Sequence, residues 1–477
     1  MRYTGLKKSL FCALGFLSCA DAFGQSYTAH RNELQTNLQI QPLKDLTLTR
    51  ILGLGPAEIH DPLPPEDTQH FFEHGYGDLR RALIKRGVTI DMEYWPQFFA
   101  NLAGGLDQKQ DYAHQISFLA NTDLDRIFGW KHASLVFSGA ERAGRRLSTD
   151  VFADDVYNPA QIYGGGGNVL FHLVYFYFQK SWDDERFRWI IGRYATGPDY
   201  DASMLLCTFG GGAVCSQPRL TTTINGYASW PSTAWGTNLK FRPTKDTYVV
   251  PGIFTSEAQH GGTAGTNWNS ATGVSLYNEI GWEPELGRNR LSGHYKIGMM
   301  WDSSPHAYNR LVTDPAPPGS RKGQLMEWVA MDQMLWRHGT YATAGLIALA
   351  GYTHTTASIA PLSDQWYVGM VDFGMIRSRP YDGFGFLFTS MRYGANVQAR
   401  YQPYYNVAPA MITMPGLGGG FQTPLVSSRQ AVMEILYRVH ISRGLYFSPE
   451  FQYFWRPGGT GRVKSAPILG FDLRVFF

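Results

Sequence analysis

Apolar and polar residues alternate with a period of two along most of the chain. Between residues 88 and 97 the even positions carry Val88, Ile90, Met92 and Tyr94, and the odd positions carry Thr89, Asp91, Glu93, Trp95 and Gln97. The same alternation recurs over 290–302, 429–442 and 444–457. Because successive side chains of a β-strand point to opposite faces, this period predicts strands with one apolar and one polar face.

About sixteen such segments follow one another, and clusters of Gly, Pro, Asn, Asp and Ser separate them. They lie near residues 88–102, 113–122, 132–140, 169–180, 185–194, 234–242, 247–257, 273–284, 290–302, 325–337, 342–354, 364–376, 386–402, 429–442, 444–457 and 466–477. Each unit has about 24 residues, enough for a membrane strand of about 9–11 residues and a connection. A closed barrel with this number of strands is wide enough to keep an aqueous channel.

The position of the aromatic residues favours a membrane barrel over a soluble sandwich. In water, a half-apolar strand normally covers its apolar face with a second sheet. Here aromatic residues gather toward strand ends, as in YFYFQKSW and FQYFWRP, where the girdles of a membrane barrel lie. The predicted fold class is therefore all-β: a transmembrane antiparallel β-barrel of about sixteen strands with a short N-terminal helix and a polar leader.

The last strand shows the same division between its two faces. Phe471, Leu473, Val475 and Phe477 form an apolar face, while Asp472 and Arg474 lie on the polar one. The final residue, Phe477, is therefore expected to belong to the apolar face of a last strand. The polar faces of the other strands mix carboxylates, Lys, Arg and His, as expected for a wet lumen.

The N-terminal segment has the features of a secretory signal peptide. Arg2, Lys7 and Lys8 form a basic region, residues 9–18 form a short apolar region, and Ala20-Asp21-Ala22 is a cleavage site. The sequence therefore predicts four parts: a signal peptide (1–22), a polar periplasmic leader (23–75), a short entry helix (76–86) that packs on the barrel end, and an outer-membrane β-barrel (87–477).

Charge and hydropathy exclude several classes of protein. The chain has 42 basic and 39 acidic residues, and removal of the signal peptide leaves 39 and 38, a formal charge of +1. No strong field attracts nucleic acid, so a nucleic-acid partner is not expected. No run of about 20 apolar residues follows the signal peptide, which argues against transmembrane helices.

Two cysteines remain after cleavage, Cys207 and Cys215, in the stretch LLCTFGGGAVCSQP. In an exported protein such a pair, closing a glycine-rich loop, predicts one local disulfide. A metal site is less favoured because no His or further Cys lies near, and two ligands do not hold zinc. Neither a metal nor a cofactor is expected.

The sequence resembles the carbohydrate-selective porins of the OprB family from about Gly77 to Phe477. The resemblance rests on GDLRRALIKRGVTIDMEY, WGTNLKFRPTKDTYVVPGIF, LYNEIGWEPELGRNRLSGHYKIGMMWDSS and LYFSPEFQYFWRPGG, followed by a last strand that ends in Phe. It implies a sixteen-stranded channel of the Gram-negative outer membrane that passes glucose-like sugars. It also implies that Phe477 is the signal read by the barrel-assembly machinery, and similar porins are often homotrimers. Asp78, the Cys207–Cys215 loop and the long leader depart from the family pattern.

No motif of a catalytic site is present. A G-x-S-x-G elbow, an H-E-x-x-H motif and a P-loop are all missing, so the protein is not expected to be an enzyme. GGGG at 164–167 lies before a predicted strand rather than a helix, which favours a flexible turn over a phosphate-binding loop.

A passive pore for neutral polyols needs donors, acceptors and aromatic rings at a constriction. Alternation assigns the following candidates to the lumen: Asp91, Glu93, Trp95, Arg188, Lys240, Arg242, Glu279, His294, Lys296, Glu434, Arg438, His440, Glu450 and Arg456. For each of them, a solvated wall position or a structural ion pair is the simpler interpretation. Glu93, Trp95, Glu279, Lys296 and Arg438 are the wall residues assigned to the substrate path.

The stretch IIGRYATGPDYDASMLLC has a better claim to the constriction. It leaves a predicted strand, turns at Gly197-Pro198, and is closed by the predicted disulfide, which would hold it folded inward. We hypothesise that Arg188, Arg193, Asp199, Tyr200 and Asp201 contribute to the constriction.

The function predicted is passive diffusion of carbohydrates, glucose-like sugars or related polyols, into the periplasm. Sugar solutes, outer-membrane lipid, lipopolysaccharide and the assembly machinery are the expected partners. A general non-selective porin and an export conduit or anchor barrel are the alternatives. A lipase is opposed by the missing nucleophile motif, and a TonB-coupled receptor by the short N-terminal region.

Overall fold

The computed structural model describes residues 76–152, 157–162, 168–182, 186–257, 262, 264–309, 319–338, 344–394, 429–442, 444–459 and 463–477. The predicted signal peptide and leader lie outside the described residues. No helix among those described is long and apolar enough to cross a membrane.

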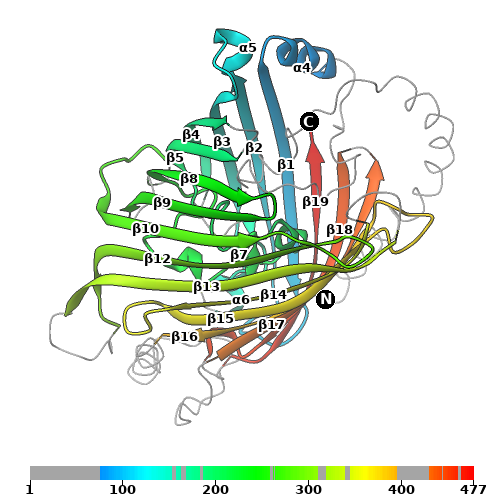
Figure 1. Cartoon of the computed structure of the whole chain (residues 1–477). Coiled ribbons are helices and arrows are strands. Elements are labelled where there is room, and N and C mark those ends of the chain that lie inside the picture. Colours follow the sequence, from blue (N-terminus) through cyan, green and yellow to red (C-terminus); the bar gives the residue numbers. More distant parts are fainter. Residues whose placement is uncertain are drawn as a thin grey trace. The chain divides into compact units, whose positions relative to one another are not determined.

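Sixteen long antiparallel strands form one closed sheet, in which each strand pairs with the next and β1 pairs with β19 (Figure 1). They are β1 (Val88–Asn101), β2 (Gln110–Asp123), β3 (Ala133–Gly144), β4 (Val169–Trp182), β5 (Phe187–Tyr194), β8 (Ala234–Thr244), β9 (Thr247–Glu257), β10 (Ala271–Trp282), β12 (Leu291–Ala307), β13 (Ser320–Arg337), β14 (Gly345–Thr355), β15 (Leu362–Phe373), β16 (Gly383–Tyr393), β17 (Arg429–Ser442), β18 (Leu445–Trp455) and β19 (Ala466–Phe476). The barrel predicted from the period-two pattern is confirmed.

Short elements lie in the connections and at the N-terminal end of the described chain. They are α4 (Tyr76–Lys85), α5 (Leu124–Phe128), α6 (Leu147–Phe152), η3 (Met204–Thr208), β6 (Val214–Cys215), β7 (Gln217–Pro218), η4 (Thr221–Thr223), β11 (Glu285–Leu286) and η5 (Pro457–Gly459). The helix α4 occupies the segment where the entry helix was expected. Its Arg80 Nη2 lies 2.8 Å from Asp91 Oδ1 of β1.

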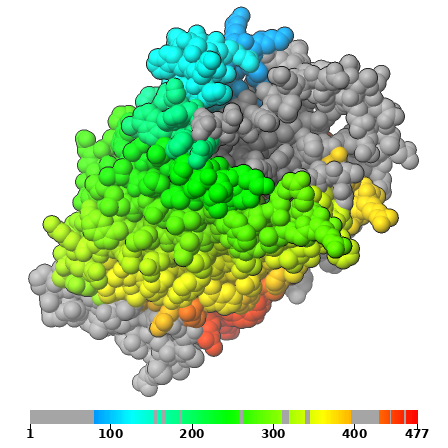
Figure 2. Space-filling view, in the orientation of Figure 1, coloured from blue at the N-terminus to red at the C-terminus, as the bar shows by residue number. Residues whose placement is uncertain are grey.

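The two faces of the sheet have the composition that alternation predicts. In β1, Asp91, Glu93, Trp95 and Gln97 are buried inside the barrel, while Met92 and Tyr94 point outward. The outward face carries large apolar residues such as Ile297, which is 58% exposed. Figure 2 shows the outer surface of the strands coloured green to yellow as continuous. An apolar outer face around a polar interior is the arrangement of a membrane barrel.

Aromatic side chains lie near both ends of this outer face. Trp366, near the start of β15, contacts Phe388 in the middle of β16 with ring centroids 5.5 Å apart, and Phe388 contacts Trp455, the last residue of β18, at 5.7 Å. Toward the opposite end of the barrel, Trp282 of β10 contacts Tyr295 of β12 at 5.3 Å. These two rows match the interfacial girdles that bound the hydrocarbon region of a bilayer.

Glycines allow inward-facing aromatic rings to lie across neighbouring strands. A Cβ added at Gly298 of β12 would lie 2.3 Å from the Trp328 ring of β13. The same holds for Gly351 and Tyr367, at 2.4 Å. The missing side chain therefore makes room for a ring that fills the lumen wall.

The connections differ in length between the two ends of the barrel. The end that carries α4, α5 and the C-terminus (Figure 1) has short connections, such as Lys245–Asp246 between β8 and β9. The other end has long ones, including 195–233 and 394–428. Short turns face the periplasm and long loops face the exterior in bacterial barrels. Phe477 lies at the short-turn end, where its backbone N–H donates to Met92 O at 2.8 Å.

Candidate functional site

A long connection between β5 and β8 folds into the lumen, and we call residues 195–233 the inner loop. It contains η3, β6, β7 and η4. Hydrogen bonds join it to inward-facing residues of β1, β5, β8, β10, β12, β13, β14, β15, β17, β18 and β19. A segment that touches so many wall strands crosses the interior of the barrel.

The first attachment of the inner loop, which we call the aspartate contact, consists of Asp199 to Ser203 and the facing wall. Arg188 of β5 donates from Nη2 to Asp199 Oδ1 at 2.5 Å. Asn238 of β8 donates to Asp199 Oδ2 at 2.7 Å. Both carboxylate oxygens of Asp199 are therefore bonded, and the ion pair is buried, with side-chain exposures of 4% and 3%.

Asp201 continues this contact toward β10 and β14. Its backbone N–H donates to Glu279 Oε2 at 2.9 Å, and its Oδ2 accepts from Thr353 at 2.7 Å. Glu279 also accepts from Tyr248 and from the indole of Trp328, each at 2.8 Å. Burial raises the pKa of the Asp201 carboxyl well above its usual value, outweighing the effect of the hydrogen bond from Thr353.

The neighbouring loop residues attach to β12 and β13. Lys296 Nζ donates to Ala202 O at 2.5 Å, and Ser203 Oγ donates to Asp332 at 3.0 Å. Tyr200 is fully buried, and its ring centroid lies 4.5 Å from that of Tyr277. The aspartate contact thus combines an ion pair, charge-assisted bonds to the backbone and an aromatic pair.

A second attachment, which we call the glycine contact, consists of Gly210 to Gly212 and the wall at β17 and β18. The N–H of Gly210 donates to Glu450 Oε2 at 2.9 Å, and the N–H of Gly211 donates to Glu434 Oε1 at 3.0 Å. The N–H of Gly212 donates to Asn158 O at 2.9 Å. Three successive backbone donors are therefore satisfied by two carboxylates and one carbonyl.

The glycine contact depends on the absence of side chains on the loop. A Cβ at Gly210 would lie 2.6 Å from Glu450 Oε2, and one at Gly211 would lie 2.6 Å from Glu434 Oε2. Gly210 O also accepts from Gln97 of β1 at 2.9 Å. Only a bare backbone approaches these carboxylates so closely.

Next to the glycine contact lies a group that we call the arginine–tryptophan patch. It consists of three residues predicted from the sequence, Glu93, Trp95 and Arg438, and of Arg474. The guanidinium carbon of Arg474 lies 3.8 Å from the centre of the Trp95 ring, and Arg474 Nη1 lies 3.9 Å from Glu93 Oε1. Arg438 Cζ lies 5.8 Å from the ring centre of Tyr446. Arg474 also donates to Cys207 O at 3.1 Å, which ties the patch to the inner loop.

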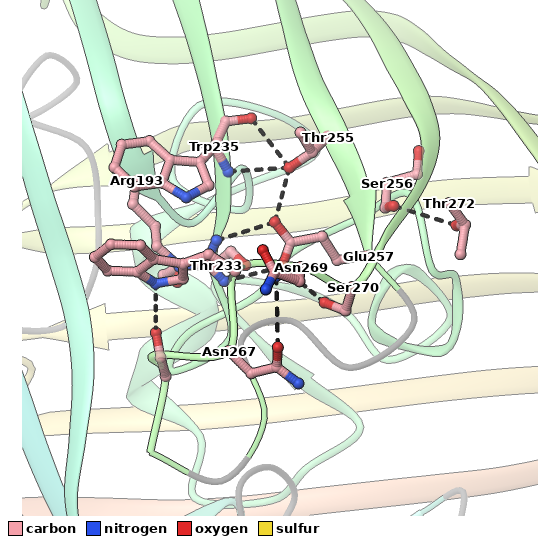
Figure 3. Close-up of polar contacts among 12 residues, drawn as sticks. Arg193, Thr233, Trp235, Thr255, Ser256, Glu257, Asn267, Asn269, Ser270 and Thr272 are labelled. Carbon is pink, nitrogen blue, oxygen red and sulfur yellow. Dashed lines mark hydrogen bonds and ion pairs between the residues drawn. The ribbon is translucent and has the colours of Figure 1, made fainter.

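Arg193 takes a different position from the other candidates of the loop stretch. It belongs to the outward row of β5, yet it is fully buried. Its guanidinium donates to both carboxylate oxygens of Glu257, at 2.9 and 3.0 Å, and to Thr233 O at 2.9 Å. Figure 3 shows Arg193 directed at Glu257 and Thr233. Arg193 therefore anchors the end of the inner loop to β9 and stands apart from the aspartate contact.

Of three further residues that the sequence assigned to the lumen, one lies well inside the barrel and two lie toward its ends. Lys240 lies inside, with Nζ 3.8 Å from the centre of the Tyr248 ring. Arg242 forms a 2.7 Å ion pair with Glu283 near the short-turn end. Arg456 is exposed and follows the last residue of β18, so it does not lie on the lumen wall.

The predicted disulfide stays a prediction. Cys207 is buried in η3, and the side chain of Cys215 lies outside the described residues. Within the described part of the chain, no group of three or more His, Cys, Asp or Glu residues has the arrangement of a metal site.

Sequence reasoning missed the glycine contact as a site. Glu434 and Glu450 were assigned to the lumen by alternation, but their partners are backbone N–H groups. The signal that identifies the place is the triple glycine at 210–212 between the two cysteines. Arg474 was placed on the polar face of the last strand, and its contact with Trp95 depends on closure of the barrel.

These features define a class of protein. A closed barrel of sixteen antiparallel strands, apolar outside and polar inside, with a loop folded across its lumen, is the architecture of an outer-membrane porin.

Residues 107–477 match the family model described as "Carbohydrate-selective porin, OprB family", and the chain belongs to this family. Porin B of Pseudomonas aeruginosa is 24% identical over 421 residues, which cover 84% of this chain and 90% of that protein. The putative porin QuiX of Acinetobacter baylyi is 24% identical over 420 residues, covering 84% and 92%. The high-pH structure of Pseudomonas putida OprB has the same fold, with a TM-score of 0.75 at 23% identity, covering 84% of this chain and 97% of that chain.

The predicted family is thus confirmed. The protein is an outer-membrane channel for carbohydrates, and sugar solutes are what it transports. The fold and the family are those of a channel and not of an enzyme.

Proposed function

We propose that the protein passes glucose-like sugars or related polyols into the periplasm by passive diffusion, and that the inner loop narrows the path. The observation that carries the proposal is the double attachment of this loop, to Arg188 on one wall and to Glu434 and Glu450 on another. A loop fixed across a lumen at two places reduces the free cross-section beside it.

The arginine–tryptophan patch contains the kinds of group that bind a sugar, and its Glu93, Trp95 and Arg474 are buried beside the inner loop. Guanidinium groups donate charge-assisted hydrogen bonds to hydroxyls, carboxylates accept from them, and an indole ring covers the apolar face of a pyranose. Glu93, Trp95 and Arg438 project from β1 and β17 beside Arg474 of β19, which supports their assignment to the substrate path. Glu279 and Lys296 contribute by holding the loop at Asp201 and Ala202. We assign no catalytic role to any of these residues.

Single-channel conductance in a planar bilayer tests this function, with glucose, gluconate and a disaccharide titrated in turn. We expect saturable block by a glucose-like sugar, and weaker block after replacement of Trp95 by Ala. Conduction without block by any of the solutes would favour the alternative of a general pore. Absence of conduction would indicate that the loop closes the lumen, and would leave an anchor or export role.

Three further proposals concern the processing and assembly of the protein. We propose that residues 1–22 are removed, that Phe477 is read by the barrel-assembly machinery, and that the protein forms homotrimers. The mass of the protein purified from membranes tests the cleavage, deletion of Phe477 tests assembly, and cross-linking in native membranes tests the trimer.

We propose a disulfide between Cys207 and Cys215, because the protein is expected to be exported and the two residues close a glycine-rich loop. Alkylation of the unfolded protein before and after reduction tests it. Two additional alkylated thiols after reduction are the expected result.

A further inference from the structure

Two short helices at the short-turn end of the barrel form one surface, which we call the periplasmic platform. It consists of α4, α5 and the residues after each helix, as far as residues 87 and 132. Arg126 of α5 donates from Nη1 to Ile84 O of α4 at 2.6 Å, and the N–H of Asp123 donates to Gly87 O at 2.7 Å. These bonds join the two helices, and Figure 1 shows both of them beyond the ends of β1 and β2.

The platform exposes large apolar side chains. Phe128 is 66% exposed, Trp130 57% and Leu79 56%, and the ring centroids of Phe128 and Trp130 lie 6.2 Å apart. These three residues lie outside the strands, so the apolar outer wall of the barrel does not include them. Large apolar side chains that are exposed beside one another on a water-facing surface mark a place where another chain docks.

Basic side chains accompany the apolar ones on both helices. Lys85 and Arg86 at the end of α4, and Arg126 and Lys131 in and after α5, are all exposed. Within the described part of the chain, Lys85, Arg86 and Lys131 have no ion-pair partner. A surface with this charge attracts an acidic segment.

The carboxylates of the platform do not cancel this charge. Among its described side chains, Asp123 and Asp125 are the acidic ones. Asp123 Oδ1 accepts from the backbone N–H groups of Asp125 and Arg126, at 3.0 and 3.2 Å, so this carboxylate caps α5. Arg80, the remaining described arginine, pairs with Asp91 of β1. Four exposed basic side chains and two acidic ones leave the platform positive.

The described chain begins directly after a segment of complementary composition. Residues 56–75, PAEIHDPLPPEDTQHFFEHG, end where α4 begins at Tyr76. They contain neither Lys nor Arg and have five acidic residues: Glu58, Asp61, Glu66, Asp67 and Glu73. Their large apolar residues are Ile59, Leu63, Phe71 and Phe72. The segment therefore has both the negative charge and the apolar side chains that the platform matches.

The direct connection to α4 brings this segment within reach of the whole platform. The 10 residues of α4 make a helix about 15 Å long. Twenty residues span at most about 66 Å, so residues 56–75 reach from the start of α4 to α5. Because the segment is tethered, its local concentration is in the millimolar range, and contacts too weak for a separate partner suffice.

We propose that residues 56–75 occupy the periplasmic platform. Phe71 and Phe72, which lie nearest to α4 in the sequence, contact Leu79, and the acidic residues between 58 and 67 lie beside the basic side chains near α5. The inference goes beyond the transport function and does not rest on it, because the platform uses no residue of the sugar path.

Photochemical cross-linking tests the position of the segment. The test uses the full mature protein in detergent, with a photoreactive benzophenone amino acid in place of Phe128. We expect irradiation to join position 128 to residues 56–75, as identified by digestion and mass spectrometry. The same probe in place of Trp336, which is 68% exposed near the short-turn end of β13, is the matched control and should lose this product. Equal yields at the two positions would overturn the proposal.

Removal of charge tests the match between segment and platform. In the protein with the probe at position 128, Lys85→Gln/Arg86→Gln should lower the cross-link yield about fourfold, about twofold for each exposed charge. High salt should lower the yield of the unsubstituted platform in the same direction, which repeats the test without a substitution. Lys245→Gln/Arg288→Gln, which changes two exposed basic residues of other short turns, is the matched control. Equal yields in the two double variants, together with a yield indifferent to salt, would contradict the proposal.

The periplasmic leaflet of the membrane is the other possible occupant of the platform. In vesicles of phosphatidylethanolamine and phosphatidylglycerol, position 128 should still be joined to residues 56–75. Products with lipid in place of the segment would show a membrane anchor and would overturn the proposal. Sugar block in Lys85→Gln/Arg86→Gln should be unchanged, so failure of the platform and failure of the proposed transport function are separately visible.

Discussion

The inner loop is attached to two regions of the barrel wall by opposite distributions of charge. At the aspartate contact the loop supplies the carboxylate of Asp199, and the wall supplies the guanidinium of Arg188. At the glycine contact the wall supplies the carboxylates of Glu434 and Glu450, and the loop supplies backbone N–H groups. The Arg188–Asp199 pair of the first attachment relies on side chains from both partners, and the second attachment on loop residues without side chains.

This difference sets how each attachment responds to mutation. A buried ion pair is costly to break, because the partner left behind is a charge in a place with little water. On the loop side the glycine contact has no side chain to delete, so a substitution there disturbs it by adding atoms. The two contacts therefore fail by different physical routes, and each route can be tested separately.

The largest effect is expected from Arg188→Ala. The substitution leaves the carboxylate of Asp199 with Asn238 as its described partner, and loss of one member of a buried pair costs about 3–5 kcal/mol. We expect the inner loop to leave the wall on this side. Limited proteolysis of the folded barrel should then cut within 195–233, and single-channel current should become noisier.

Arg242→Ala is the matched control for this experiment. Arg242 also lies on a wall strand and forms an ion pair, at 2.7 Å from Glu283, but neither residue belongs to the inner loop. The control should leave the loop resistant to protease. If the two variants behave alike, the Arg188–Asp199 pair does not hold the loop.

A smaller effect is expected from Gly211→Ala at the glycine contact. The added Cβ would lie 2.6 Å from Glu434 Oε2, and overpacking of this kind costs about 1–3 kcal/mol. Proteolysis should cut near residue 211, and combination with the shorter side chain of Glu434→Asp should restore resistance. Gly197→Ala, where the nearest atom is the flexible Gln217 amide at 3.1 Å, is the control. Resistance equal to the wild type in Gly211→Ala would show that the carboxylates move freely.

The barrel could be predicted from the sequence because each strand has its own alternation of polar and apolar residues. Alternation with period two identifies both the strand and its lumen face, as for Asp91 and Ile90, without knowledge of the neighbours. The predicted positions of the strand ends were less accurate. β16 begins at Gly383, three residues before its predicted start, because glycines at 383 and 385 interrupt the alternation while the backbone still pairs with β17.

The site could be predicted only in part, because its contacts join residues that lie far apart in the sequence. Arg188, Asp199 and Asp201 carry charge and stand close to a turn, so their residue types suggested a common place. Arg193 has the same charge, but its parity puts it on the outward row of β5, where it meets Glu257 from a strand 64 positions further along the chain. The glycine contact uses backbone donors and spans 240 positions between Gly210 and Glu450. Neither distance leaves a local pattern in the sequence.

The smallest effect is expected from Asp201→Asn, and it appears as a change in pH dependence. Burial raises the pKa of Asp201, which lies in the inner loop and not in a membrane-spanning strand, above its usual value near about 3.9. The folded protein therefore holds a proton that the unfolded chain releases. Its contribution to stability is complete below the usual pKa and is lost as the pH rises through the raised value.

Asn resembles the protonated carboxyl in shape and carries no charge. The variant should match the wild type at acidic pH and hold the loop better at alkaline pH. Protease resistance of the loop, measured from pH 4 to pH 9, shows the difference as a flatter profile. Parallel profiles would mean that Asp201 keeps its charge beside Thr353 and Lys296, and that both loop aspartates of the aspartate contact, Asp199 and Asp201, are ionised.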